Sequence, residues 1–126
     1  MAKILIVDDN APSRELIREV LQSPGNGIME AGDGHEALAA IAEEHFDLVL
    51  MDIQMPGLDG YAAIRRIRSD ERTRSLRVVA LTAYAMRGDI EKAIGAGFDA
   101  YITKPIDLAT LRKRVDLLLQ NPRTGL

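Results

Sequence analysis

Acidic, hydroxyl and basic side chains follow several short apolar segments of the chain. Asp8 and Asp9 follow segment 4–7, Asp52 follows segment 47–51, and Thr82 follows segment 77–81. Lys104 lies just past Ile102. Carboxylates packed together repel one another, so they must share protons or bind a cation. All-oxygen ligation suits a hard cation such as Mg²⁺. A metal, a lysine and a hydroxyl group can together hold a phosphoryl group, and a carboxylate can accept one.

Each of these residues alone also has an ordinary structural interpretation. An acidic residue after a strand often caps the following helix, as Asp8 or Asp9 would do. Threonine commonly ends strands, and a single lysine such as Lys104 usually lies at the surface. Asp52 ends an otherwise apolar segment, where capping is less natural, so a functional role is favoured there. The combination of these residues at strand ends therefore indicates chemistry more strongly than any one of them.

Short apolar segments alternate with amphipathic segments of helical length along the chain. We predict strands at residues 4–7, 28–31, 47–51, 77–81 and 100–102, with a helix after each one. The first helix is expected to turn Leu16, Ile17, Val20 and Leu21 toward the core. The alternation predicts one α/β domain in which helices cover both faces of a parallel sheet. Ligands of such sheets bind beyond the carboxyl ends of the strands, where these polar residues would meet.

The composition narrows the classes of function. A net charge of −3 at pH 7 offers no basic face for direct nucleic-acid binding. The chain has no cysteine, which excludes disulfides and thiolate metal sites. No apolar segment approaches the roughly 20 residues that span a bilayer, so we predict a cytoplasmic protein with no membrane partner. Residues 1–120 would form the domain, and residues 121–126 a flexible tail or linker stub.

The order and spacing of these residues resemble the receiver domains of two-component response regulators. The resemblance runs from about Lys3 to Leu119 and rests on Val7–Asn10, Leu50–Gly60, Ala80–Ala83 and Tyr101–Pro105. It implies a flavodoxin-like (β/α)5 fold, which is a three-layer, doubly wound sheet of five parallel strands in the order 2-1-3-4-5. The segment Ala83–Asp89 makes the chain similar to single-domain receivers of the DivK kind or to receivers of hybrid kinases.

The resemblance implies a phosphoacceptor switch in a phosphorelay and not an enzyme that acts on a metabolite. Asp52 would accept a phosphoryl group from a sensor histidine kinase or a histidine phosphotransfer protein. Asp9, Asp52 and the backbone carbonyl of Gln54 would bind Mg²⁺ directly. Asp8 would act on the metal through a bound water. The only reactions of the chain would be self-phosphorylation from a phosphodonor and slow self-dephosphorylation.

The resemblance also implies how the switch would act. Thr82 and Lys104 would hold phosphoryl oxygens, and Tyr101 would rotate inward together with Thr82. The Lys104–Pro105 peptide bond is expected to be cis. These movements would bias the surface formed by the fourth helix, the fifth strand and the fifth helix. That surface would control a downstream protein partner, and it is also a candidate homodimer interface.

Two neighbours of the site are expected to tune the lifetime of the phosphoryl group. Gln54 lies two residues past the acceptor, and Tyr84 lies two residues past Thr82. In the family these positions flank the path of the attacking water. The bulk of Tyr84 therefore predicts slow self-dephosphorylation.

Three other residues have structural interpretations. Gly60 is expected to give the backbone the flexibility for the turn into the third helix. His35 and His45 are expected at the surface and not as metal ligands, since they lie at the two ends of a polar helical segment.

Other functions remain open on the residues alone. A phosphatase or phosphotransferase with an aspartyl intermediate would want a second acid where this chain has Gln54. A flavodoxin-like FMN carrier would need a hydroxyl- and glycine-rich loop where the chain has residues 8–12. The P-loop pattern Gly-x4-Gly-Lys-Ser/Thr is absent. A scaffold that does not use phosphorylation is disfavoured, because unused buried charge is costly.

Overall fold

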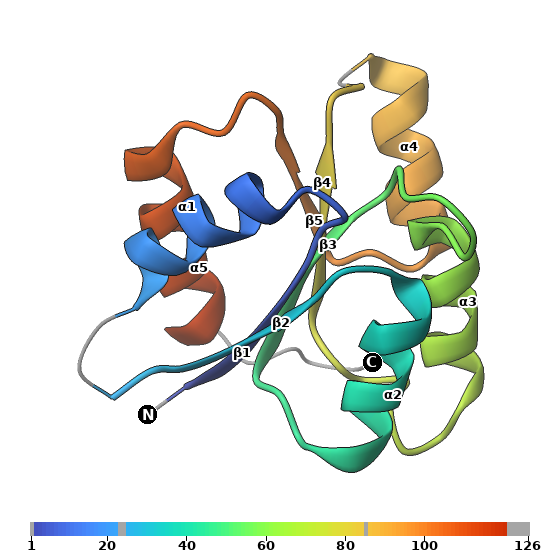
Figure 1. The fold of residues 1–126 in the computed structure, drawn as a ribbon. Coiled ribbons are helices and arrows are strands. Elements are labelled where there is room, and N and C mark those ends of the chain that lie inside the picture. The colour runs from blue at the N-terminus through green and yellow to red at the C-terminus, as the bar shows by residue number, and fades with distance from the viewer. Residues whose placement is uncertain (1, 23–24, 85, 121–126) are drawn as a thin grey trace.

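The computed structural model describes residues 2–22, 25–84 and 86–120 (Figure 1). The strands are β1 (Lys3–Val7), β2 (Gly27–Ala31), β3 (Leu48–Asp52), β4 (Val78–Thr82) and β5 (Ala100–Thr103). The helices are α1 (Ala11–Leu21), α2 (Gly34–Glu43), α3 (Gly60–Ser69), α4 (Arg87–Ala96) and α5 (Leu108–Gln120). The predicted alternation is confirmed, whereas the predicted tail, residues 121–126, lies outside the described residues. None of the described helices has the length and apolar content that a membrane-spanning helix needs.

All five strands are parallel, and their order is β2-β1-β3-β4-β5, as expected. The chain leaves β1 toward β2 on one side and leaves β3 toward β4 on the other. The carboxyl ends of β1 and β3 therefore lie at the switch point of the sheet, where ligands of such folds bind. The register pairs Val7 with Met51, so the next residues along the two segments, Asp8 and Asp52, come next to one another.

Two apolar cores flank the sheet, one on each face. Helices α1 and α5 cover one face, and α2, α3 and α4 cover the other (Figure 1). Within β1, Ile4 and Ile6 pack in the core with α1 and α5, whereas Leu5 and Val7 pack in the opposite core. Because both faces are covered, β1 is apolar at consecutive positions and does not alternate with polar residues.

Side-chain caps begin four of the helices just beyond the strand ends. The Oδ1 atoms of Asn10, Asp33 and Asp59 accept hydrogen bonds from the backbone N–H groups of Ser13, Glu36 and Ala62. At α5 the Oδ1 atom of Asp107 accepts from the backbone N–H groups of Ala109 and Thr110. Such a bond satisfies one of the free N–H groups of the first helical turn. At α1 the cap is Asn10, so the structure does not use the carboxylates of Asp8 and Asp9 for capping.

The prediction that Leu16 belongs to the core face of α1 is wrong. Its side chain is 46% exposed, whereas Ile17 and Leu21 are buried against the sheet. Ile17 and Leu21 are four residues apart and share one helix face, while Leu16 is rotated by about 100° from Ile17. An apolar residue in the sequence therefore did not by itself identify the buried stripe.

The explanation expected for Gly60 is also wrong. Its backbone is not in the left-handed region, so conformational freedom is not what the position requires. A Cβ atom there would lie 2.6 Å from Cα of Ile53 and 2.8 Å from the carbonyl oxygen of Asp52. Glycine is needed because the start of α3 packs directly against the backbone at the end of β3. His35 and His45 are exposed, as predicted.

Candidate functional site

Three carboxylates lie together beyond the carboxyl ends of β1 and β3. Asp8 and Asp9 follow β1, Asp52 ends β3, and one oxygen from each lies within 4.8 Å of the others. Asp8 is fully buried and Asp52 is 5% exposed, whereas Asp9 is exposed. The strand order thus brings the three predicted acids to one place.

Lys104 joins this cluster from the end of β5. Its Nζ atom donates hydrogen bonds to Oδ2 of Asp8 at 3.1 Å and to Oδ2 of Asp52 at 3.0 Å. The backbone N–H of Lys104 also donates to the carbonyl oxygen of Thr82 at 2.7 Å, which ties the loop to β4. The peptide bond between Lys104 and Pro105 is cis, the expected isomer.

The charges of the cluster perturb one another. The pKa of Asp52 is raised, chiefly because the carboxyl group is buried, and the charge of Asp8 adds to this. Hydrogen bonds from the Gln54 N–H and from Lys104 act in the opposite direction. Burial also acts to lower the pKa of Lys104, but its hydrogen bonds to the two carboxylates outweigh burial and leave that pKa raised. One ammonium group cannot neutralise three carboxylates, so the cluster favours an additional cation.

The donor atoms fit a hard divalent cation such as Mg²⁺, because all three side chains offer oxygen. Both oxygens of Asp8 already accept hydrogen bonds, Oδ1 from the Asn10 N–H at 2.9 Å and Oδ2 from Lys104. Asp52 is similarly engaged, since its Oδ1 accepts from the Gln54 N–H at 2.9 Å. Within the described part of the chain, no hydrogen bond or ion pair reaches the carboxylate of Asp9. The carboxylate of Asp9 is therefore the one most open to a cation.

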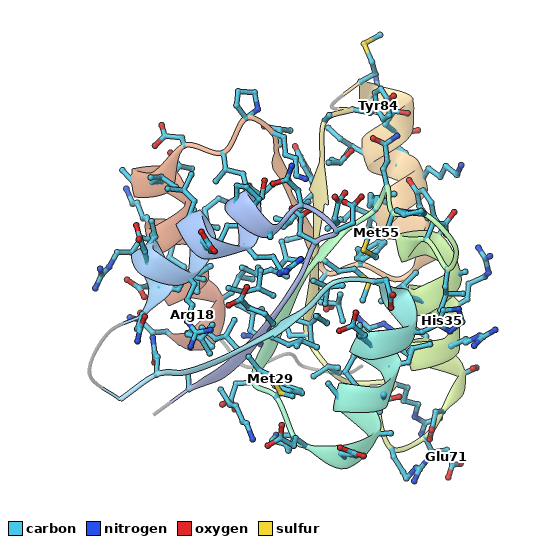
Figure 2. All side chains as sticks on the ribbon, viewed as in Figure 1. Arg18, Met29, His35, Met55, Glu71 and Tyr84 are labelled. Atoms are coloured by element: carbon cyan, nitrogen blue, oxygen red, sulfur yellow. The ribbon has the colours of Figure 1, made fainter. Side chains whose placement is uncertain are left out.

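Thr82 lies at the end of the neighbouring strand, but its hydroxyl group is engaged elsewhere. Its Oγ1 accepts from the backbone N–H of Tyr84 at 2.9 Å and donates to the carbonyl oxygen of Tyr84 at 3.2 Å. Across the described residues, no hydrogen bond links this hydroxyl group to Asp52 or Lys104. The side chain of Tyr84 is 55% exposed and lies beside the start of α4 (Figure 2).

The other two predicted residues lie around the site and not in the carboxylate cluster. Tyr101 is half-buried on β5, where it packs against the core on the α2–α4 side of the sheet. The guanidinium group of Arg114 lies 5.7 Å from the centre of its ring. Gln54 is exposed, and its backbone N–H holds Asp52.

Sequence reasoning missed a basic group that touches the site. The Nη1 atom of Arg14 donates a hydrogen bond to the backbone carbonyl oxygen of Asp8. Its Nε donates to Glu30 on β2, and Arg18 donates to the same carboxylate. The only available signal was that Arg14 and Arg18 are four residues apart and so share one helix face. Nothing local in the sequence pairs that face with Glu30.

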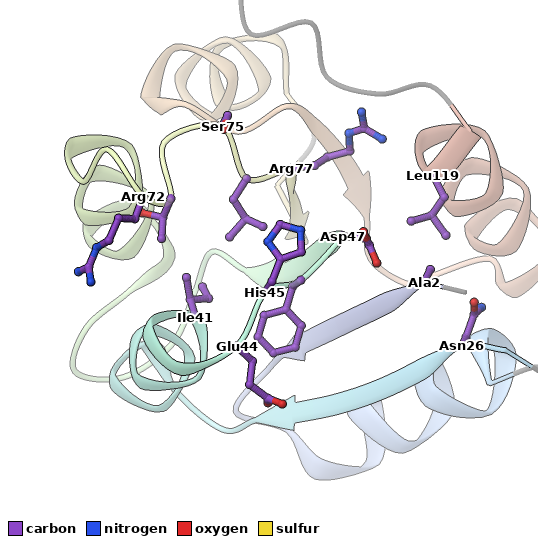
Figure 3. Close-up of a pocket in the computed structure, with 13 residues that line it drawn as sticks. Ala2, Asn26, Ile41, Glu44, His45, Asp47, Arg72, Ser75, Arg77 and Leu119 are labelled. Carbon is purple, nitrogen blue, oxygen red and sulfur yellow. The ribbon is translucent and has the colours of Figure 1, made fainter.

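Two clefts of ligand size lie near opposite ends of the sheet. One, of about 580 Å³, is lined by residues that precede the strands, among them Ala2, Asp47 and Arg77 (Figure 3). It includes none of the cluster residues. The other, of about 610 Å³, also includes none of the cluster residues, but it is lined by Ile53, the neighbour of Asp52 in the chain, and by Thr82. The second cleft is therefore the one near the end of β3.

Comparison with known proteins identifies close relatives of the chain. Residues 4–116 match the family model of the response regulator receiver domain. The chain is 41% identical over 127 residues to the sensor protein GacS of Pseudomonas syringae pv. syringae, covering 95% of the chain but 14% of GacS. It is 40% identical over 119 residues to the chemotaxis protein CheY-3 of Vibrio cholerae, covering 94% and 92%. It is 39% identical over 105 residues to the polar-differentiation response regulator DivK of Brucella ovis, covering 83% and 85%.

Solved structures agree with the family match. The Vibrio cholerae chemotaxis response regulator CheY4 superposes with a TM-score of 0.88 at 28% identity, covering 94% of this chain and 98% of that one. The receiver domain of the sensor histidine kinase PA1611 from Pseudomonas aeruginosa, whose structure has a magnesium ion in the active-site cleft, gives 0.86 at 35% identity, covering 95% and 98%. The chain therefore belongs to the response regulator receiver domains, which are signalling switches of two-component systems.

Proposed function

We propose that this receiver domain is the phosphoacceptor switch of a two-component phosphorelay and that Asp52 accepts the phosphoryl group. The observation that carries the proposal is the bridge that Lys104 makes between Asp8 and Asp52 inside a cluster of three carboxylates. The donor would be a phosphohistidine of a sensor kinase or of a histidine phosphotransfer protein. One carboxylate oxygen of Asp52 forms a bond to phosphorus while the phosphorus–nitrogen bond breaks. The electron pair stays on the imidazole, which then takes a proton from water.

Mg²⁺ would be held by Asp9, Asp52 and the backbone carbonyl of Gln54, with Asp8 acting through a water. The metal supplies positive charge against the phosphoryl oxygens. The different burial of Asp8 and Asp9 supports this division of roles. Asp8 is fully buried, which suits an indirect role. Asp9 has an exposed carboxylate, which suits a direct one.

The switch would operate through Thr82 and Lys104, which would hold phosphoryl oxygens. To do so, the hydroxyl group of Thr82 must exchange its present bonds with the backbone of Tyr84 for the phosphoryl group. That exchange would release the connection from β4 to α4, and Tyr101 would turn inward beside it. Two arrangements of the α4-β5-α5 surface would then be biased by the charge on Asp52.

The α4-β5-α5 surface would meet a downstream protein partner or a second copy of the chain. Large apolar side chains are exposed on and before α4, namely Tyr84, Met86 and Ile94. Exposed apolar side chains of this kind occur at sites of protein–protein contact. The domain would act in the cytoplasm, and its own chemistry would stay limited to slow self-phosphorylation and self-dephosphorylation.

Intact mass spectrometry after incubation with acetyl phosphate and Mg²⁺ tests the proposal. The wild type should gain one phosphoryl group, and Asp52→Asn should gain none. Asp116→Asn, which removes an exposed carboxylate from α5, is the matched control and should be phosphorylated like the wild type. A wild type without an adduct, or an undiminished adduct in Asp52→Asn, would contradict the proposal.

A further inference from the structure

The peptide that joins the two acids after β1 is held from α1. The Nη1 atom of Arg14 donates a hydrogen bond to the carbonyl oxygen of Asp8, which belongs to the Asp8–Asp9 peptide. The Nε atom of the same guanidinium group donates to Oε1 of Glu30 at 3.1 Å. The Arg14 side chain is only 20% exposed, and its guanidinium group links the residue after β1 to Glu30 on β2.

Glu30 in turn is held in place by a second arginine. Nη1 of Arg18, which is labelled in Figure 2, donates to Oε2 of Glu30 at 2.7 Å. The hydrogen bond from Arg18 lowers the pKa of Glu30, burial opposes it, and the hydrogen bond from Arg14 assists it, with a net lowering. Glu30 therefore stays ionised near neutral pH and anchors the guanidinium group of Arg14.

The backbone is what locates Asp9. Among the residues that the structure describes, none makes a hydrogen bond or ion pair with the Asp9 carboxylate, so the peptide before Asp9 positions the backbone from which that side chain extends. The carbonyl oxygen held by Arg14 defines the plane of that peptide. A guanidinium group can bond a carbonyl oxygen and a carboxylate at fixed relative angles, which the point charge of a lysine cannot do.

We propose that Arg14, oriented by Glu30, is a positioning residue that places the Asp9 carboxylate for the divalent cation. The inference rests on the proposed function, in which Asp9 is a direct ligand of Mg²⁺. Arg14 does not touch the cation or the phosphoryl group. It acts through the backbone of Asp8, as outer-shell groups act on metal ligands elsewhere.

Isothermal titration calorimetry with Mg²⁺ tests the inference on the folded chain. Arg14→Met should weaken the binding of Mg²⁺ by about 10-fold, the lower range for loss of an outer-shell partner. Arg14→Lys should show a similar loss, because it keeps the charge but not the fork geometry. Arg65→Met is the matched control, since it removes an exposed arginine from a helix, α3, without touching the contacts among Arg14, Arg18 and Glu30. Its Mg²⁺ affinity should equal that of the wild type.

Phosphorylation by acetyl phosphate supplies a second readout that a general loss of stability would not produce. In Arg14→Lys the Mg²⁺ concentration for half-maximal rate should rise by the same factor, while the rate at saturating Mg²⁺ stays at the wild-type value. Wild-type affinity in Arg14→Lys, or an equal loss in Arg65→Met, overturns the inference alone. A wild type that does not bind Mg²⁺ overturns both this inference and the proposed metal site. Should Arg14→Met fail to fold, Arg14→Lys carries the test.

Discussion

The Nζ atom of Lys104 lies 3.0 Å from Oδ2 of Asp52, although the two residues are 52 positions apart in the chain. The same Nζ lies 3.1 Å from Oδ2 of Asp8. One ammonium group from the end of β5 thus reaches across β4 to the ends of β1 and β3. A phosphoryl group on Asp52 would form beside a cation that is already in position, which limits the reorganisation needed during the reaction.

Lys104→Met should therefore slow self-phosphorylation. The phosphoryl oxygens lose a charged partner, and removal of one such donor typically costs about 100-fold in rate. The measurement is the initial rate of adduct formation with acetyl phosphate at saturating Mg²⁺, followed by intact mass. Lys113→Met removes an exposed lysine from α5 and should leave the rate unchanged. A rate in Lys104→Met within a few-fold of wild type would show that Lys104 is not needed for transfer.

Asp9→Asn should abolish the stabilisation of the fold by Mg²⁺. A ligand that binds only the folded state at about 100 times its Kd raises the free energy of unfolding by about 2.7 kcal/mol. Thermal unfolding with and without Mg²⁺ should show this rise in the wild type and in Asp116→Asn. Asp9→Asn should show little rise, because it loses a negatively charged oxygen ligand. An equal rise in Asp9→Asn would exclude Asp9 as a direct ligand.

Tyr84→Ala should shorten the lifetime of the phosphorylated form. The backbone of Tyr84 is hydrogen-bonded to Thr82, and both residues line the cleft beside the end of β3. Removal of the ring should open the path of the attacking water and shorten the half-life several-fold. The decay of the adduct after removal of acetyl phosphate measures this. Met86→Ala is the control, because it removes an exposed side chain that does not line the cleft. The phosphorylated Met86→Ala protein should have the half-life of the wild type. An unchanged half-life in Tyr84→Ala would count against the idea that the Tyr84 ring hinders the attacking water.

Gly60→Ala should destabilise the fold by about 1–3 kcal/mol, the usual cost of overpacking. Its new Cβ would meet the backbone of Ile53 at 2.6 Å, and a backbone atom directly after a central strand cannot move aside cheaply. Urea denaturation measures the change in the free energy of unfolding. Gly88→Ala is the matched control, because a Cβ there has no neighbour within 4 Å and alanine favours a helix. The control should be neutral or slightly stabilised, and equal behaviour of the two variants would contradict the steric argument.

Glu30 should make part of the stability depend on acid pH. Its pKa in the folded state is lowered from 4.5, chiefly by the hydrogen bond from Arg18. A lowered pKa means that the stabilisation is fully present above the unfolded-state value and is lost as the pH falls through the folded-state value. The difference in free energy of unfolding between wild type and Glu30→Gln should accordingly be largest at neutral pH and shrink below pH 4.5. A difference that is constant from neutral to acid pH would argue against the ion pairs as its source.

Much of the fold and part of the site could be predicted because they depend on local patterns. Asp52 stands after a run of apolar residues that could only be a strand covered on both faces. Asn10 and Asp59 precede helices at the position where a side chain can cap the first turn. Interactions of this kind involve residues within a few positions of one another, so the spacing of residue types is sufficient to find them.

Other features depend on contacts between distant segments. Leu16 is apolar but faces solvent, because the packing of α1 on the sheet selects Ile17 and Leu21 instead. Gly60 is required by the approach of α3 to β3, which no turn rule describes. Arg14 and Glu30 meet only because β2 lies beside β1, so helical spacing alone could not pair them.

The sequence by itself determined the five alternating strands and helices, and which polar residues stand at the strand ends. Only the tertiary structure decided that Lys104 lies between Asp8 and Asp52, that Thr82 bonds to Tyr84, and that Arg14 holds the peptide before Asp9. The physical reason is that strand order and helix docking are set by the total burial of both faces of the sheet. A local period of 2 or 3.6 residues reports which face a side chain takes, but not which distant side chain it will meet.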